Sequence, residues 1–309
     1  MRGARHGLCA AGRRLHLAHG PIGIIAEAEG PADEVAAAYR QAVARFEGLL
    51  EALVAELPLL RSPIRRGGAN PMTDPVARRM WQAAASMPAD FVTPMAAVAG
   101  AVAEAVLADM VAGRALERAQ VNNGGDIALW LAAGARPYRI GVVVDPAAPK
   151  SPGHLVVAPQ MALRGVATSG RHGRSHSRGI ADSVTVLAPR AAEADVAATL
   201  IANAVDLPGH PAIGRLPAAT LAPDSDLGAR LVTVSVGPLS PAEVARALDA
   251  GEALARGLCR TGLIAAAILV LGGVVRCLGA EHHPLLPPAT AGQGARNLSS
   301  EPLKGVAHA

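Results

Sequence analysis

The sequence predicts an α+β domain in which mixed sheets are packed by alanine-rich helices. Apolar segments with the alternating or continuous pattern of strands occur together near the N-terminus and again between helical segments. Aromatic residues are only 2% of a chain that is 51% hydrophobic, so the core must be built from small aliphatic side chains. This partly segregated, partly alternating order favours one compact α+β or mixed α/β unit.

The N-terminal part is expected to hold two strands followed by a helix. Residues 13–30 alternate apolar and polar positions on either side of a His-Gly-Pro turn, as two strands do. Residues 32–57 carry apolar residues at helical spacing, with acidic residues in the first turn and Pro58 just beyond the end. This pattern predicts one long amphipathic helix. The Pro-, Gly- and Arg-rich residues 61–75 form either a turn-rich connection or a mobile arm near a ligand.

The rest of the chain alternates predicted helices and strands. Helices are expected at 76–87, 92–113, 191–205 and 240–258. Strands are expected at 119–122, 128–131, 138–146, 182–189 and 231–237. The helix expected at 92–113 consists largely of small residues, which would let a neighbouring backbone or a ligand approach closely.

Two further segments matter for the class of protein. Residues 261–275 are strongly apolar, but they are shorter than the roughly 20 residues of a membrane span and are interrupted by glycines. They are therefore expected to form a central strand or a buried helix end. Residues 281–309 have the composition of a disordered tail.

Charge and cysteine content exclude several classes. The net charge of +4 is spread along the chain without a Lys/Arg block, which argues against nucleic-acid binding. The three cysteines fit no metal-ligand spacing, and the N-terminus lacks the continuous apolar region of a secretory signal. We therefore expect a cytoplasmic protein that contacts neither nucleic acid nor a membrane.

The first of three motifs that could carry chemistry is the turn at residues 121–129, VNNGGDIAL. Paired glycines between strands permit positive φ and expose backbone N–H groups that can cradle an anion or admit a flat ring. The same sequence is also a good hairpin turn. The candidate cofactor-binding residues here are Asn123, Gly124, Gly125 and Asp126.

The second motif is the polar stretch at residues 165–186, GVATSGRHGRSHSRGIADSVTV. Thr168, Ser169 and Gly170 resemble a tight turn with hydroxyl groups. Arg171, His172 and Arg174 offer donors suited to phosphate oxygens. His176 lies close to the next strand and is the candidate general base. The alternative is a solvated basic loop.

The third motif is Asp195 with Thr199. The two residues are four apart on a predicted helix, so they share one face. A carboxylate and a hydroxyl, with a backbone carbonyl nearby, form a hard oxygen site suited to Mg²⁺. The alternative is an ordinary surface pair.

The order of these motifs resembles that in the ApbE family of flavin transferases, which use Mg²⁺ to move FMN from FAD onto a protein threonine. The shared blocks are GGDI, then TSG with a histidine after it, then SVTVLA followed by AD-x-x-x-T. Longer segments, TPMAAVAGAVAE, VNNGGDIAL, ATSGRHGRSHSRGIADSVTV and AATLIANAV, are similar to the UPF0280 group of ApbE-like proteins. The resemblance implies a single ApbE-like, T-fold-related domain over residues 13–280.

The resemblance also implies roles for individual residues. Gly124 and Gly125 match glycines that lie against the flavin nucleotide, and Asp195 with Thr199 matches the Mg²⁺ pair. His176 stands at the approximate place of the transferases' histidine, although no Asp-Pro follows it and the loop before it is shorter. Ala99-Gly100 stands where the transferases have Lys-Gly, so the lysine is missing.

The sequence thus favours an enzyme that handles a flavin or a nucleotide with Mg²⁺. Its ligand would be a phosphate-bearing small molecule such as FAD or FMN, and a protein could be the acceptor. Two alternatives remain open: a non-catalytic protein that binds a flavin or an anionic metabolite, and an accessory partner of a redox enzyme.

Overall fold

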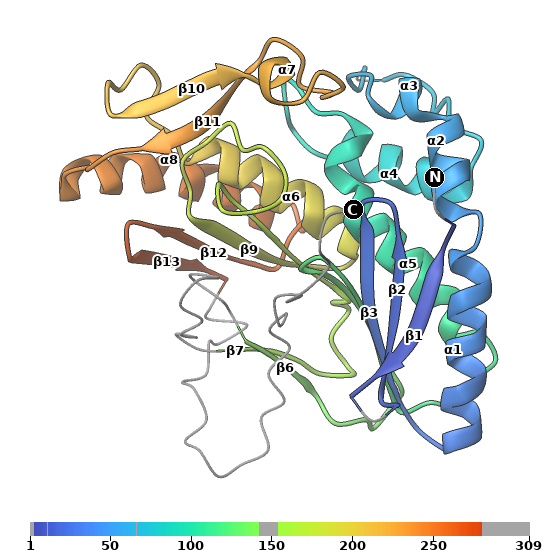
Figure 1. Ribbon diagram of the computed structural model, residues 1–309. Coiled ribbons are helices and arrows are strands. Elements are labelled where there is room, and N and C mark those ends of the chain that lie inside the picture. Colours follow the sequence, from blue (N-terminus) through green and yellow to red (C-terminus); the bar gives the residue numbers. More distant parts are fainter. Residues whose placement is uncertain (1–2, 11, 66, 142–153, 280–309) are drawn as a thin grey trace.

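A long antiparallel sheet forms the framework of the protein. The computed structural model describes residues 3–10, 12–65, 67–141 and 154–279. Within this part of the chain nine strands pair in the order β1-β2-β3-β4-β5-β8-β9-β12-β13 (Figure 1). Their bounds are β1 Arg5–Cys9, β2 Arg14–His19, β3 Ile22–Glu29, β4 Arg118–Asn123, β5 Asp126–Leu131, β8 Gly165–Ser169, β9 Ser183–Ala188, β12 Ala266–Leu271 and β13 Val274–Leu278. Every neighbouring pair is antiparallel.

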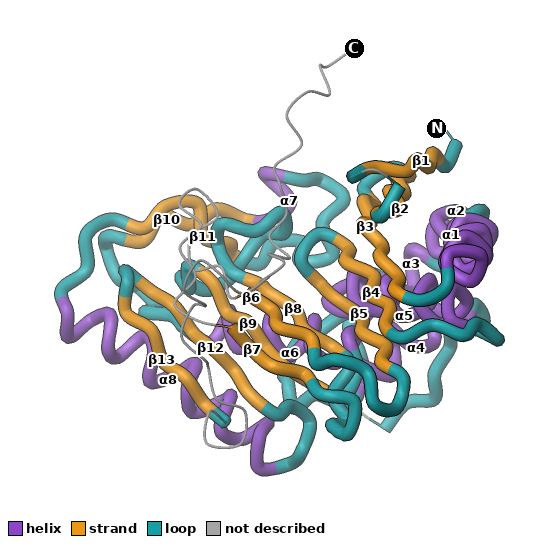
Figure 2. Tube along the Cα trace, turned by 90° about the horizontal axis from the view of Figure 1, so that it is seen from below, coloured by secondary structure: helices purple, strands orange, loops and turns teal. Residues whose placement is uncertain are grey.

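The four long helices α1, α5, α6 and α8 lie on one face of this sheet (Figures 1 and 2). The described helices are α1 Ala32–Phe46, α2 Leu49–Ala55, α3 Leu57–Leu60, α4 Pro75–Ala85, α5 Val98–Val111, α6 Ala191–Ala204, α7 Ala218–Leu221 and α8 Pro241–Arg260, with a 3₁₀ turn, η1, at Pro94–Ala97. Alanines and valines fill the space between the helices and the strands. Because these side chains are small, α5 and α6 approach both the sheet and each other closely.

The opposite face of the sheet is covered at its centre by a short hairpin. Strands β6 (Tyr138–Gly141) and β7 (His154–Val157) pair antiparallel and pack a second apolar cluster against β5, β8 and β12. A third pair, β10 (Ile213–Pro217) and β11 (Leu231–Val236), forms its own two-stranded sheet. The sheet therefore has a core on both faces, which agrees with the predicted α+β class.

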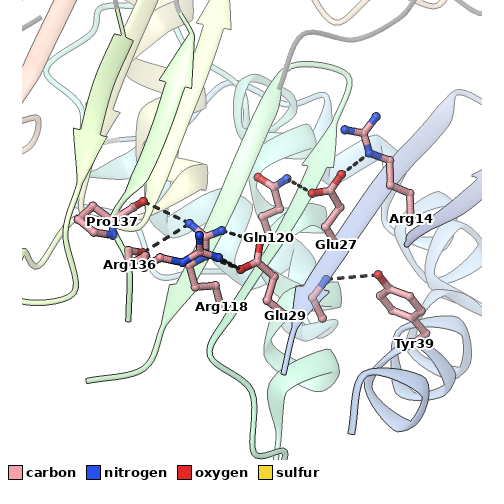
Figure 3. A network of polar contacts seen from close by, with 9 residues as sticks. Arg14, Glu27, Glu29, Tyr39, Arg118, Gln120, Arg136 and Pro137 are labelled. Atoms are coloured by element: carbon pink, nitrogen blue, oxygen red, sulfur yellow. Dashed lines mark hydrogen bonds and ion pairs between the residues drawn. The ribbon is translucent and has the colours of Figure 1, made fainter. Parts of the chain in front are cut away.

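Beside the hairpin, the sheet surface carries a polar network (Figure 3). Glu29 accepts hydrogen bonds from Arg118 and from Arg136, and Gln120 donates to Glu27 over 3.2 Å. The guanidinium of Arg118 also lies 4.7 Å from the centre of the Tyr138 ring. These contacts pair the charged groups where the apolar cluster ends, and the contact of Arg118 with Tyr138 holds β6 against the sheet.

Several predicted elements are corrected by the structure. The helix expected at 32–57 is broken after Phe46, because Gly48 adopts a left-handed conformation (φ +71°) and α2 and α3 follow it. Strand β1 has no alternating apolar pattern and was not predicted. The strand expected at 138–146 is described only as far as Gly141, and the tail at 281–309 lies outside the described residues.

The apolar stretch at 261–275 forms β12, a Gly272-Gly273 turn and the start of β13, which confirms the prediction of a central strand. One described segment, Pro94–Val111, is a helix long and apolar enough to cross a membrane. It packs against α1, α6, β4 and β5, and 56% of it is buried. The segment is therefore accounted for as a core helix.

Candidate functional site

The turn between β4 and β5 is built by its two glycines and two asparagines. Gly124 and Gly125 have φ of +69° and +117°, conformations that favour glycine. The side chain of Asn122 accepts a hydrogen bond from the Gly125 N–H over 2.8 Å. The buried Asn123 donates to the carbonyl of Ala99 over 3.2 Å, which ties the turn to the start of α5. The predicted hairpin turn is confirmed, and it lies against a helix.

Two carboxylates from distant parts of the sequence meet beside this turn. Asp126, the first residue of β5, accepts a hydrogen bond from the Thr168 N–H over 3.2 Å. Asp195 of α6 accepts one from the Gly100 N–H over 2.9 Å. Burial raises the pKa of Asp126 to about 7, and burial together with the charge of Asp126 raises the pKa of Asp195 well above its usual range. Two neighbouring carboxyl groups whose ionisation is disfavoured by burial would both be stabilised in their ionised form by a positive charge between them.

The close contact between α5 and α6 brings these acids together. A Cβ atom on Gly100 would lie 2.3 Å from the carbonyl oxygen of Ala191, so the two helix backbones touch at this point. Glu104 strengthens the contact by accepting a hydrogen bond from the Ala192 N–H over 3.0 Å. At the place where the resemblance implied a missing lysine, this chain thus uses a backbone N–H to hold Asp195.

Thr199 lies one turn after Asp195 on α6, as the spacing predicted. Its side chain is partly buried. The described residues contain no group of three or more histidines, cysteines and acids that could hold a metal ion. A cation at this point would therefore depend on the two carboxylates, the threonine hydroxyl and the oxygens of a ligand.

The TSG motif does not form the tight turn that the sequence suggested. Thr168 and Ser169 are the last two residues of β8, and the Thr168 Oγ1 lies 2.9 Å from the Thr185 Oγ1 on β9. Only Gly170 turns the chain, with φ of +153°, and a Cβ there would lie 2.5 Å from the Asp182 carbonyl oxygen. Strand pairing overrides the local turn preference, because β8 and β9 continue to the end of the motif.

Asp182 is a charged residue to which the sequence analysis gave no role. One of its carboxylate oxygens lies 2.7 Å from Nη2 of Arg171 and 3.4 Å from Nε2 of His172. The other accepts a hydrogen bond from the Gly272 N–H over 2.7 Å, at the turn between β12 and β13. The Asp182 carboxylate therefore neutralises positive charge in the first part of the basic loop, so no bound anion is needed at Arg171 or His172. The local signal for this role was an acid directly before a strand and after a run of bases.

Arg174 and His176 occupy the exposed tip of the same loop. The guanidinium of Arg174 lies over Gly124, where a Cβ would come within 1.8 Å of its Nη2, and its charge favours the ionised form of Asp126. Among the described residues, none makes a hydrogen bond or ion pair with His176. The loop thus brings Arg174 to the acid pair, whereas His176 projects from the tip.

A scan against family models matches residues 6–277 to the family described as AbpE bacteria. The chain belongs to this family. The UPF0280, ApbE-like assignment expected from the motifs is confirmed. Similar proteins include a UPF0280 protein of Methanosarcina barkeri, 38% identical over 43% of this chain and 49% of that protein. A UPF0280 protein of Methanopyrus kandleri is 42% identical over 36% of this chain and 43% of that protein.

The match to these relatives spans about half of their length. Among solved structures, the chain is similar to the flavinyl transferase ApbE of Pseudomonas stutzeri, with 14% identity and a TM-score of 0.43 over 89% of this chain and 93% of that one. It is also similar to the flavin transferase ApbE of Vibrio cholerae, with 12% identity and a TM-score of 0.38 over 91% and 99% of the two chains.

Proposed function

We propose that this family member is a Mg²⁺-dependent enzyme that handles a flavin or a nucleotide, with phosphoryl chemistry of the FMN-transferase kind. The observation that carries the proposal is the pair formed by Asp126 and Asp195. Burial raises the pKa of both carboxylates, and the charge of Asp126 further raises the pKa of Asp195, so a divalent cation between them would stabilise their ionised forms.

The chemistry of the donors fits Mg²⁺. Carboxylate and hydroxyl oxygens are hard ligands, and Asp126, Asp195 and Thr199 supply them from β5 and α6. When bound, the cation would neutralise charge on the phosphate oxygens of the ligand. Because the protein offers few ligands, the bare site is expected to bind weakly and to tighten when a phosphate adds its own oxygens.

The residues around the acid pair would bind and orient the rest of the ligand. Gly124 and Gly125 leave the turn without side chains, so a flat or anionic group can lie against the backbone. Arg174 offers fixed, always-charged donors to phosphate oxygens. Asn123 holds the turn against α5, and Ser169 ends β8 next to Gly170.

Proton transfer is assigned to His176. It is exposed at the loop tip, where an acceptor hydroxyl from another molecule could reach it. A ring nitrogen of its imidazole would take the proton of that hydroxyl as the hydroxyl oxygen attacks the FMN-side phosphorus of FAD, while the pyrophosphate P–O bond breaks and AMP leaves. A protein acceptor and a cytoplasmic location belong to this proposal as well. The motif resemblance to the flavin transferases makes FAD the first substrate to test.

The test is a titration of the purified protein with FAD, FMN and ATP, in Mg²⁺ and in EDTA, followed by mass spectrometry of the products. Asp195→Asn should weaken binding in Mg²⁺ and have little effect in EDTA. His176→Asn should retain binding and lose turnover. An equal loss in both buffers for Asp195→Asn would mean that the carboxylate is structural, and would contradict the proposal.

The position of His176 favours a second candidate function. No carboxylate of the described residues orients its ring, as an efficient general base usually requires. A protein that binds a flavin or an anionic metabolite without converting it would have the same acid pair and glycine turn. It would show Mg²⁺-dependent binding of FAD in the titration and no product.

A further inference from the structure

One arginine fills the space over the glycine turn. A side chain at Gly124 is impossible with Arg174 in place, because a Cβ would lie 1.8 Å from its Nη2 and 2.9 Å from its Cζ. The guanidinium therefore occupies the surface against which a ligand is proposed to lie. The turn is covered by this chain's own positive charge.

The same guanidinium is the positive partner of a buried acid. Asp126 is 9% exposed, and Arg174 is the group whose charge favours its ionised form. The two do not form an ion pair within 4 Å among the described residues, unlike Arg171, which is paired with Asp182 at 2.7 Å. The interaction of Arg174 with the acid pair is thus electrostatic and without a fixed hydrogen bond, so it can be exchanged.

The loop is fastened on both sides of Arg174. On one side the Arg171 N–H donates to the Ala181 carbonyl over 2.9 Å. On the other, the Ser177 carbonyl accepts from the Thr233 N–H over 2.8 Å, and the Arg178 N–H donates to the side chain of Asn203 over 2.8 Å. Between these anchors residues 172–176 are exposed. The side chain of Arg174 can therefore leave the turn while the rest of the loop stays in place.

We propose that Arg174 is a built-in counter-ion that covers the glycine turn and is displaced when a divalent cation and a phosphate-bearing ligand bind together. This inference rests on the proposed function and adds the way in which the two ligands are coupled. A cation alone must bind against the charge of Arg174 and is held weakly. A phosphate group attracts the guanidinium away from the acid pair and binds it, so each ligand strengthens the binding of the other.

The test measures Mn²⁺ affinity, by electron paramagnetic resonance of the free ion, with and without inorganic pyrophosphate. Arg174→Gln should bind Mn²⁺ alone at least about fivefold more tightly than the unmodified protein, and pyrophosphate should strengthen its binding less than it does in the unmodified protein. Arg174→Lys keeps the charge and should keep the weak affinity. Arg246→Gln, at an exposed arginine of α8, controls for the change in net charge.

The outcomes separate this inference from the proposed function. Unchanged or weaker Mn²⁺ binding by Arg174→Gln, or an equal strengthening by pyrophosphate in all variants, would overturn the counter-ion role and leave the cation site of the proposed function intact. Failure of every variant, including the unmodified protein, to bind Mn²⁺ in either condition would overturn both. Because Arg174 is exposed, thermal melting should show all four proteins equally folded.

Discussion

The close contact between α5 and α6 can be tested with one methyl group. Gly100→Ala places a Cβ 2.3 Å from the Ala191 carbonyl oxygen, 2.5 Å from its carbon and 2.7 Å from the Ala192 nitrogen. All three are backbone atoms, so α6 must move by about 1 Å, at an overpacking cost of about 1–3 kcal/mol or more. Alanine offsets about 0.5–1 kcal/mol of this through its better helix propensity. The free energy of unfolding should therefore fall by about 1–2 kcal/mol.

Urea and thermal unfolding measure this change, and the chain supplies a matched control. Gly257 also lies inside a helix, α8, but has no atom within 4 Å of the place where its Cβ would be. Gly257→Ala should therefore raise the free energy of unfolding by about 0.5–1 kcal/mol. Opposite signs for the two substitutions support the packing of α5 on α6. A Gly100→Ala protein as stable as the unmodified chain would refute the reasoning.

Three further predictions concern the site and its surroundings. Gly125→Ala should cost about 1–2 kcal/mol of stability because the φ of Gly125 is +117°. If a ligand lies against the turn, FAD titration of the same sample should show that the loss of binding free energy exceeds the loss of stability. A loss of stability alone would contradict that placement. Asp182→Ala should speed tryptic cleavage in the loop at 171–178, since Arg171 and Gly272 both lose their acceptor; unchanged cleavage would mean that the strands alone hold the loop. Glu243→Gln should lower the melting temperature at pH 7, because the hydrogen bond from His210 lowers the pKa of Glu243 to about 2 in the folded protein. The difference in melting temperature should shrink as the pH falls below the ordinary pKa of 4.5 toward 2. A difference that is constant with pH would show that charge is not involved.

Most of the secondary structure could be predicted because its signals are local. Asp74 and Ser240 cap α4 and α8, and the alternating pattern identifies β2 and β3. The break in the first long helix was missed, since apolar spacing continues through Gly48 and only its left-handed φ interrupts the helix. The edge strand β1 was missed because all its residues are exposed and carry no apolar pattern.

The candidate site was predicted in part. Asp195 with Thr199 and the glycine turn have local signatures, and the structure brings the carboxylate of Asp126 close enough to Asp195 for its charge to raise the pKa of Asp195. The two carboxylates are close because α6 packs against β5 and α5, and residue spacing along the chain does not predict this packing. The role of Asp182 likewise needs the turn at Gly272, 90 residues away in sequence. Sequence patterns therefore identified the groups, whereas long-range packing decided their partners.

The central claim, a divalent cation between Asp126 and Asp195, is tested most directly by anomalous diffraction from crystals soaked in Mn²⁺ with pyrophosphate. The account predicts one strong peak between the two carboxylates, bonded to an oxygen of each, and its loss in Asp195→Asn. Density without a peak at this position, or a peak that persists in Asp195→Asn, would contradict it.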